Sequence, residues 1–309
     1  MSNKQTTSHI LMVRPAGFGF NPVAAESNHF QHKVEGLSES EVKELAMSEF
    51  SALSSALREA GVTVNIVEDS PEPKKHDAVF PNNWGTFHQN GTVVLYPMEL
   101  ENRRWERRRN ILEMLGEGYK IENEIDLSHY EEDNKFLEGT GSLIFDHPNR
   151  LAYACVSTRT NDEVLGDWCK KIGYQAVLFH SVDANGHPIY HTNVMMSMAT
   201  NYVVICMESI KDEEEKLMLK AKFEETGKAL VDISLEQVSN FAGNVIELED
   251  QHGNSLLAMS SRAYGAFTAE QKALIEQYSK IVHAPIPTIE KVGGGGARCM
   301  IAEVFLPLK

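Results

Sequence analysis

Short strand-like segments recur along the whole chain, and some of them come in pairs joined by tight turns. Turn-forming residues at 145–150 and 249–254 join two such pairs. The strand-like segments lie at 9–13, 62–67, 93–96, 142–145, 151–156, 176–179, 194–197, 202–206, 245–247, 255–259 and 300–304. Amphipathic helical patterns lie at 41–60, 161–172, 211–226 and 268–281. Because hairpins and strand–helix–strand segments are mixed, we expect repeated ββαβ units in an α/β fold rather than a simple doubly wound sheet.

The expected helices have defined ends, and the chain has no obvious linker. Gly61 follows the first helical pattern as a C-cap, and Asn161 and Gly173 flank the second as N-cap and C-cap. No stretch rich in Pro, Gly or Ser divides the 309 residues. We therefore expect a single domain over residues 1–309.

Composition argues against several classes of partner. A formal net charge of -15 leaves no basic excess for nucleic acid or for an anionic membrane surface. No apolar run approaches the roughly 18 residues that span a bilayer, and the first residues carry no apolar signal core. The four cysteines, Cys155, Cys169, Cys206 and Cys299, lack paired metal-binding spacing. We expect a cytoplasmic protein with reduced thiols and without a metal.

One cysteine stands apart from the other three, because Cys299 follows four glycines and one arginine in the segment 293–300. Glycines allow a ligand to approach the backbone closely, and a neighbouring cation favours the nucleophilic thiolate. Arg298 either holds Cys299 as a thiolate or only braces the loop. The alternative for Cys299 is a buried structural thiol. The run is not a dinucleotide fingerprint, since it lacks the G-x-G-x-x-G order and precedes a strand-like segment.

Three further segments carry groups that could act with a thiol. Glu138 stands between an apolar pair and Gly139, and His191 precedes an apolar strand-like segment. A thiolate nucleophile needs such a proton-transfer partner and an orienting carboxylate. The segment 76–84 places Asn82 and Asn83 between aromatic residues. Taken singly, each has an ordinary explanation as a solvated acid, a structural histidine or a turn.

Taken together, these segments resemble in their order the guanidino-group modifying superfamily, which includes arginine deiminase, dimethylarginine dimethylaminohydrolase and glycine amidinotransferase. That family carries an F-x-R-D-like segment, then E-G-G-D, then H-x-D, and then a glycine-rich loop that ends in the catalytic cysteine. The corresponding stretches here are 80–83, 138–141, 191–193 and 293–299. The resemblance spans most of the chain and implies the pentein fold, a five-bladed α/β propeller of pseudo-symmetric ββαβ units.

The resemblance also implies roles for three residues. Cys299 would be the nucleophile that attacks the central carbon of a planar N–C–N group. His191 would protonate the leaving amine and then deprotonate water, and Glu138 would orient His191. Release of the covalent intermediate by water would make the protein a hydrolase, whereas release by a second amine would make it a transferase. No cofactor is implied.

The chain departs from the family where two carboxylates would clamp a guanidinium, because the matching positions are the amides Asn83 and Asn193. Two amides cannot neutralise a buried cation, but they suit a neutral ureido group, which has one C=O acceptor and N–H donors. The segment Thr140-Gly141 replaces Gly-Asp and removes another acid. We therefore expect a ureido substrate, with L-citrulline the leading candidate, and the chain resembles the citrulline-utilising hydrolases of this superfamily.

Other readings remain open beside the citrulline hydrolase. One is an arginine deiminase or an amidinotransferase that acts on a guanidino substrate. Another is a catalytically silent propeller that binds an amino acid or a partner protein, although Cys299, His191 and Glu138 argue against it. The sequence is compatible with both a monomer and a homo-oligomer.

A free amino acid also needs its α-carboxylate and α-amino group held. Arg159, in a segment that resembles a carboxylate-binding segment of the deiminases, is the first candidate for the carboxylate. Arg103 and Arg104 lie where the family would place another carboxylate-binding arginine. Arg104 is preferred of the two but is weaker than Arg159, because 103–109 is a dense basic stretch typical of a solvated helix face. Arg14, in the first strand-to-loop segment, is a further weak candidate. Asp77 is a candidate for the amino end, with a turn cap as its alternative. The cysteines other than Cys299 are expected to be core residues.

Overall fold

A computed structural model describes residues 4–26 and 28–309 of the chain. Its strands form five three-stranded sheets within these residues. The strands are β1 (His9–Arg14), β2 (Thr63–Glu68), β3 (Gly85–Phe87), β4 (Thr92–Leu95), β5 (Asn123–Asp126), β6 (Ile144–Asp146), β7 (Leu151–Cys155), β8 (Gln175–Phe179), β9 (Met196–Met198), β10 (Tyr202–Ile205), β11 (Ala229–Asp232), β12 (Ile246–Glu249), β13 (Ser255–Ser260), β14 (Lys280–Ala284) and β15 (Ala302–Glu303).

The five sheets share one connectivity. In each, the middle strand pairs antiparallel with one neighbour and parallel with the other, as β7 does with β6 and β8. The parallel partners are connected through helices, so each unit reads ββαβ. The helices are α1 (Glu39–Glu59), α2 (Glu101–Arg104), α3 (Arg109–Gly118), α4 (Gly139–Ser142), α5 (Asp162–Ile172), α6 (Glu213–Glu225), α7 (Leu235–Ser239), α8 (Ser261–Ala266) and α9 (Ala269–Ile275). The expected repeated ββαβ units are therefore present.

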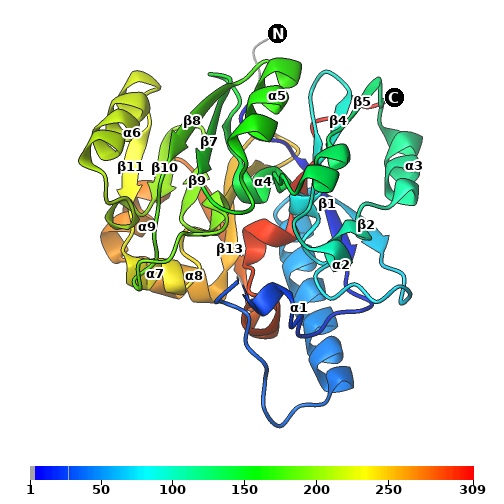
Figure 1. Cartoon of the computed structure of the whole chain (residues 1–309). Coiled ribbons are helices and arrows are strands. Elements are labelled where there is room, and N and C mark those ends of the chain that lie inside the picture. The colour runs from blue at the N-terminus through cyan, green and yellow to red at the C-terminus, as the bar shows by residue number, and fades with distance from the viewer. Residues whose placement is uncertain (1–3, 27) are drawn as a thin grey trace.

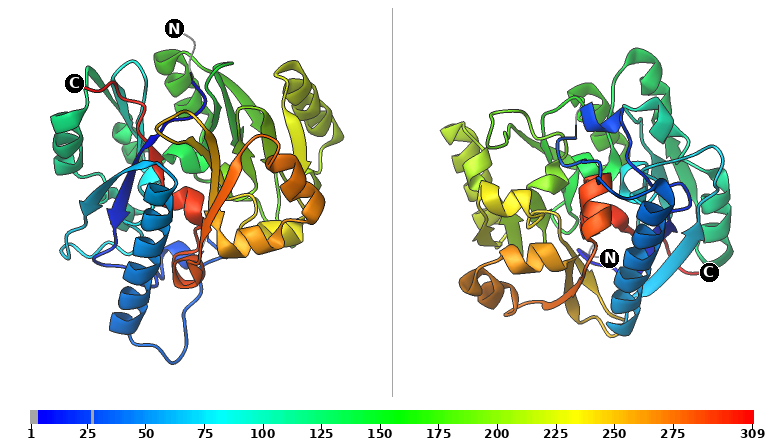
Figure 2. Two further views of the ribbon diagram at one scale, coloured as in Figure 1. Left: turned by 180° about the vertical axis from the view of Figure 1, so that it is seen from behind. Right: turned by 90° about the horizontal axis from the view of Figure 1, so that it is seen from below.

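One sheet joins the two ends of the chain. Strand β15 pairs antiparallel with β1, through Ile10 opposite Glu303, and β1 pairs parallel with β2. Figure 2 shows the segment that leads into β15, drawn in red, near the middle of the molecule, with α1 in blue at its periphery. The C-terminal segment is thus built into the fold beside the N-terminal strand.

Strands β3, β6, β9, β12 and β15 are the antiparallel partners of the middle strands and are called the inner strands below. Neighbouring inner strands lie against one another, since β15 contacts β3, and β9 contacts both β6 and β12. The longer helices α1, α3, α5 and α6 lie towards the outside (Figure 1). No helix of residues 4–26 and 28–309 has the length and apolarity needed to cross a membrane.

Local sequence signals explain the helix ends. Helix α1 begins at a capping box formed by Ser38 and Glu41, and α5 has Asn161 as its N-cap. Gly173 ends α5 in the left-handed region, with φ of 79°. The prediction of one helix over 268–281 is wrong beyond α9, because Lys280–Ala284 forms β14 and pairs parallel with β13.

Each inner strand is preceded by a short turn or bend. These are the 3₁₀ turns Pro81–Asn83, Thr192–Val194 and Ala297–Met300, the single turn of α4, and the bend at 241–244. The turns of α4 and of Pro81–Asn83 contact each other, as do α4 and Thr192–Val194, and Pro81–Asn83 and Ala297–Met300. The fold therefore gathers the segments singled out in the sequence at one end of the inner strands.

Candidate active site

The Cys299 thiol lines a pocket at this end of the inner strands. The pocket is lined by Ala24, Asn28, Gln31, Asp77, Phe80, Asn83, Arg103, Arg159, Tyr190, His191, Gly293, Gly294, Gly295 and Cys299. The glycine run is required by packing, because a Cβ at Gly295 would lie 2.8 Å from the Phe80 ring. Gly294 also has φ of +66°, which side-chain-bearing residues rarely adopt. The run packs Cys299 closely against its neighbours.

Two asparagine side chains donate hydrogen bonds to the Cys299 sulfur. Asn244 Nδ2 lies 3.1 Å from Sγ, and Asn193 Nδ2 lies 3.3 Å from it. Asn244 is itself fixed, since its Nδ2 donates to the Asn193 carbonyl and its Oδ1 accepts from the Cys299 backbone N–H. Both amides present donors to the sulfur, so both stabilise a thiolate there.

Burial nevertheless raises the pKa of Cys299 above its ordinary value, and the bond from Asn244 and the charge of Arg298 only partly offset this. Arg298 is engaged elsewhere, because its guanidinium contacts Glu303 at 2.9 Å and donates to the Ile301 carbonyl. Of the two roles considered for Arg298, the contacts favour bracing the loop.

His191 and Glu138 form a buried pair in the same pocket, with Nε2 and Oε2 2.7 Å apart. Burial opposes the charge of Glu138, but Arg159, His191 and Arg103 together hold the pKa of this carboxyl well below its usual range. Burial lowers the pKa of His191 to about 4, against the opposing effect of Glu138. At neutral pH the imidazole is therefore neutral, donates Nε2–H to the ionised Glu138, and keeps Nδ1 as an acceptor.

Gly141 stands where the E-G-G-D pattern of the family has its aspartate, and the packing around it excludes a side chain. A Cβ at this position would lie 2.3 Å from Asn83 Nδ2 and 2.9 Å from His191 Nδ1. Any side chain on residue 141 would displace the Asn83 amide or the imidazole. The space that the family pattern gives to a carboxylate is occupied here by these two groups.

The two amides leave one donor and one acceptor buried. Arg103 Nη2 donates to Asn83 Oδ1 at 3.1 Å, which fixes the amide and leaves its Nδ2 free. Asn193 turns its Nδ2 to Cys299 and leaves its Oδ1 free. Among the described residues neither free atom has a hydrogen-bond partner. Buried polar atoms without partners are rare. Asn83 lines the pocket, and Asn193 lies beside it through its bond to Cys299.

Two arginines and one acid complete the charged lining of the pocket. Arg159 contacts Glu138 at 3.3 Å and Glu99 at 2.9 Å, and its guanidinium lies over the Tyr190 ring. Asp77 is 2% exposed and accepts from Asn21 and Gln31. Both residues lie where the sequence predicted, in the pocket of Cys299.

Arg104 lies elsewhere, and its neighbour Arg103 lines the pocket instead. Arg104 donates to the Met98 and Glu99 carbonyls and pairs with Glu131, whereas Arg103 is 4% exposed and contacts Glu106 at 2.8 Å. The expectation for Arg104 is thus corrected, because the turn of α2 points adjacent side chains in different directions. Arg14 also lies outside the pocket and pairs with Glu68.

The assembled groups fit nucleophilic attack on a small polar carbon centre. They provide a thiol, an imidazole with a free acceptor nitrogen, and a carboxylate that orients it. Comparison with known proteins identifies the family of this chain. The model of the family described as "N,N dimethylarginine dimethylhydrolase, eukaryotic" matches residues 14–306. The chain belongs to this family.

Solved structures share the fold of this family member. The N-terminal domain of ArgZ, described as an arginine dihydrolase from the ornithine–ammonia cycle in cyanobacteria, gives a TM-score of 0.74 at 19% identity, with 97% of this chain and 98% of that chain covered. Unliganded AgrE gives 0.74 at 20% identity, and covers 97% of this chain but 40% of its own. A dimethylarginine dimethylaminohydrolase with an S-methyl-L-thiocitrulline adduct gives 0.62 at 15% identity, with 96% and 99% covered. No match was found among curated proteins.

This membership places the chain in the guanidino-group modifying pentein superfamily, as the resemblance implied. The structures matched are mixed α/β folds like the one described here, and at these identities they support the fold alone.

Several residues of the site were not predicted from the sequence. Asn244 stands in the bend before β12, at the place that Asn83 and Asn193 hold before β3 and β9. Alignment of the five units could have found it. Asn28 and Gln31 come from the loop before α1, and Gln31 Nε2 binds the Gly293 carbonyl at 2.9 Å. No periodic pattern marks such loop residues.

Proposed function

We propose that the protein is a Cys299-dependent hydrolase of a non-peptide C–N bond of a ureido amino acid, with L-citrulline the leading candidate. We further propose that its five sheets are the blades of a single-domain propeller. Membership of the family, with Cys299, His191 and Glu138 brought together, supports a thiol-dependent hydrolase in general. The choice of a ureido group depends on the two amides beside Cys299, Asn83 and Asn193.

The carrying observation is the polarity of the free amide atoms. Asn83 offers Nδ2, a donor, and Asn193 offers Oδ1, an acceptor. A urea presents a carbonyl to the first and an N–H to the second. A guanidinium has only N–H donors, so it would place a donor against the Asn83 Nδ2 donor. Arg103 Nη2 donates to Asn83 Oδ1, so a rotation of the amide that exchanged Oδ1 and Nδ2 would place the Arg103 donor against the Asn83 donor.

The chemistry follows from the protonation states of the pocket. Cys299 Sγ attacks the ureido carbon, with its proton taken up by His191 Nδ1. The imidazolium, stabilised by Glu138, returns a proton to the δ-nitrogen, and the C–N bond to ornithine breaks. A carbamoyl group then remains on the sulfur. Water, deprotonated by His191, attacks this group and releases the thiol and carbamate, which decays to carbon dioxide and ammonia.

The remaining lining residues suit the α-carbon end of an amino acid. Arg159 and Arg103 supply positive charge for the carboxylate, and Asp77 supplies negative charge for the amino group. Arg159 also contacts Glu138, so the same side chain supports the catalytic pair. Substrate binding and orientation of His191 are thus linked through Arg159.

Arginine is the second candidate substrate. ArgZ is described as an arginine dihydrolase, and the buried carboxylate of Asp77 could face a guanidinium. Hydrolysis of arginine at the same carbon passes through citrulline if ammonia leaves first. Turnover of citrulline therefore requires attack on the ureido carbon, whichever of the two substrates the protein takes first.

The experiment is to measure ornithine, citrulline and ammonia released from L-citrulline and L-arginine side by side, with Cys299→Ala as the control. Ornithine from citrulline, lost in the control, supports the proposal. Citrulline as the end product from arginine would show an arginine deiminase and refute it. Turnover of neither substrate, with Cys299 still reactive to iodoacetamide, would also refute it and indicate another ureido or guanidino compound or an amine acceptor.

A further inference from the structure

A second pocket lies at the opposite ends of the inner strands. It is lined by His88, Gln89, Asn90, His147, Arg150, Ile172, Tyr174 and Phe305. His88 to Asn90 follow β3, His147 to Arg150 form the turn after β6, and Phe305 follows β15. The catalytic turns precede these same strands. The two pockets are therefore separated by the length of the inner strands, and neither shares a lining residue with the other.

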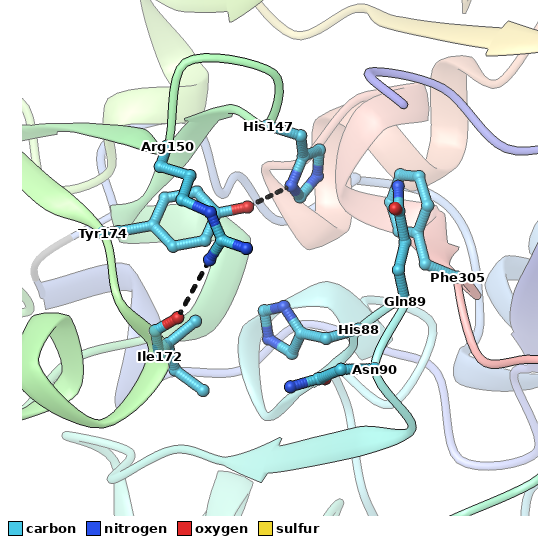
Figure 3. Close-up of a pocket in the computed structure, with 8 residues that line it drawn as sticks. All are labelled: His88, Gln89, Asn90, His147, Arg150, Ile172, Tyr174 and Phe305. Atoms are coloured by element: carbon cyan, nitrogen blue, oxygen red, sulfur yellow. Dashed lines mark hydrogen bonds between the residues drawn. The ribbon is translucent and has the colours of Figure 1, made fainter. Parts of the chain in front are cut away.

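The second pocket is rich in donors. Figure 3 shows the guanidinium of Arg150 and the rings of His88 and His147 around one hollow, with Asn90 and Phe305 at its side. None of the described lining residues is an acid, although the chain carries 44 acidic against 29 basic residues. Glu303 lines an adjoining hollow with His88 and His147, but it is paired with Arg298 at 2.9 Å.

A chain of hydrogen bonds ends at His88. Trp168 Nε1 donates to the Tyr96 oxygen at 2.8 Å, and the Tyr96 hydroxyl lies 2.8 Å from Thr86 Oγ1. Thr86 Oγ1 in turn lies 2.8 Å from His88 Nε2. When Tyr96 donates to Thr86 and Thr86 donates to Nε2, the His88 proton resides on Nδ1, the other ring nitrogen. Burial lowers the pKa of His88 to about 4, so the ring is neutral at neutral pH.

Asn90 and Arg150 present donors as well. Asn90 Oδ1 accepts from the Thr92 N–H at 3.1 Å, which leaves its Nδ2 for the pocket. The Arg150 guanidinium makes one hydrogen bond within the described residues, at 3.5 Å to the Ile172 carbonyl, and lies 5.9 Å from the centre of the Tyr174 ring. The amide and the guanidinium thus have donors directed by neighbouring groups, and the imidazole adds a third when its proton is on Nδ1. Such donors suit oxygen atoms of negative charge.

We propose that this pocket binds a small oxyanion, such as phosphate, bicarbonate or a short carboxylate. Arg150 supplies the charge, and His88 and Asn90 supply directed N–H donors. Tyr174 and Phe305 form apolar walls that limit the size of the ligand. The proposal does not depend on the substrate of the catalytic pocket.

The test is isothermal titration calorimetry at neutral pH and constant ionic strength, with sodium phosphate, bicarbonate and acetate as probes and chloride as the reference. Arg150→Gln is compared with Arg109→Gln, an exposed arginine paired with Glu124. Arg150 is exposed and makes few contacts, so its variant should fold. Because Arg103 and Arg159 of the catalytic pocket could also take an anion, the difference between variants is the readout.

We expect saturable binding of at least one oxyanion that weakens about tenfold in Arg150→Gln and stays unchanged in Arg109→Gln. Preference for bicarbonate would link the site to a product of ureido hydrolysis, whereas preference for phosphate or acetate would assign an unrelated ligand of the same class. Absence of binding beyond chloride, or equal affinity in both variants, would overturn the proposal.

Discussion

The two ends of the inner strands hold their charged groups in different ways. At the catalytic end Glu138 is paired with Arg159 and accepts from the neutral His191, and Arg103 contacts Glu106. At the other end the Arg150 guanidinium is exposed, and none of the described lining residues is an acid. Burial keeps the imidazoles neutral at both ends, since it lowers the pKa of His191 and of His88 to about 4 and that of His147 to about 3. The first end suits catalysis with paired charges, and the second offers to an anion neutral donors and a cation that is unpaired among the described residues.

The largest expected effect tests whether pairing at the catalytic end is required. Glu138→Gln removes the acceptor charge that orients His191 and stabilises its protonated form. We expect kcat to fall about 100-fold to 10 000-fold, in measurements of ornithine release. The matched control is Glu99→Gln, which removes the other carboxylate on Arg159 but does not touch His191. Equal losses in both variants would show that Arg159, rather than His191, is what Glu138 serves.

A smaller effect is expected from the donors to the sulfur. Asn244→Ala removes a bond that lowers the pKa of Cys299, so the thiolate fraction at a fixed pH should fall. We expect alkylation by iodoacetamide to slow about tenfold, the change that one pKa unit gives. Asn201→Ala, at an exposed turn, is the control. In the unliganded wild type the alkylation rate should still rise above about pH 8.5, because burial raises this pKa. A plateau at lower pH would contradict the account of Cys299.

The smallest effect concerns stability at the far end. The folded pKa of His88, about 4, lies below the unfolded value, so the unfolded state binds a proton first as the pH falls. Its contribution is fully present above about pH 6.5 and is lost between about pH 6.5 and 4. We expect His88→Asn to make the decline in unfolding free energy shallower by up to about 1.4 kcal/mol per pH unit, in urea titrations. The exposed His252→Asn gives the baseline, and an unchanged slope in His88→Asn would refute burial as the cause.

The sequence predicted the longer apolar strands better than the short or polar ones, and the three-residue strand β3 was missed although it is buried. Apolar segments such as 151–156 and 202–206 became β7 and β10 nearly as expected. The outer strand β5 was missed because its residues, Asn123 to Asp126, are polar and mostly exposed, so they carry no core pattern. Strand β14 was missed because its residues continued the helical pattern of α9.

The site was predicted where its residues stand in motifs. Cys299, His191, Glu138, Asn83 and Asn193 lie together because each precedes or begins an inner strand. Arg104 was chosen over Arg103 because a sequence does not show which of two adjacent side chains turns inward. The role of Arg298 stayed open at the sequence level, because neither its pairing with Glu303 nor the burial of Cys299 can be read from a motif.

The ratio of kcat/KM for L-citrulline to that for L-arginine, measured in the wild type and in Asn83→Asp, tests the central claim most directly. A ratio is insensitive to a uniform loss of activity. The aspartate would replace the free Nδ2 donor with a charged acceptor, so the account predicts that the wild type favours citrulline. It also predicts that the ratio falls at least about 30-fold in the variant. A wild type that favours arginine, or a ratio that the variant leaves unchanged, would contradict the claim that the amides select a neutral ureido group.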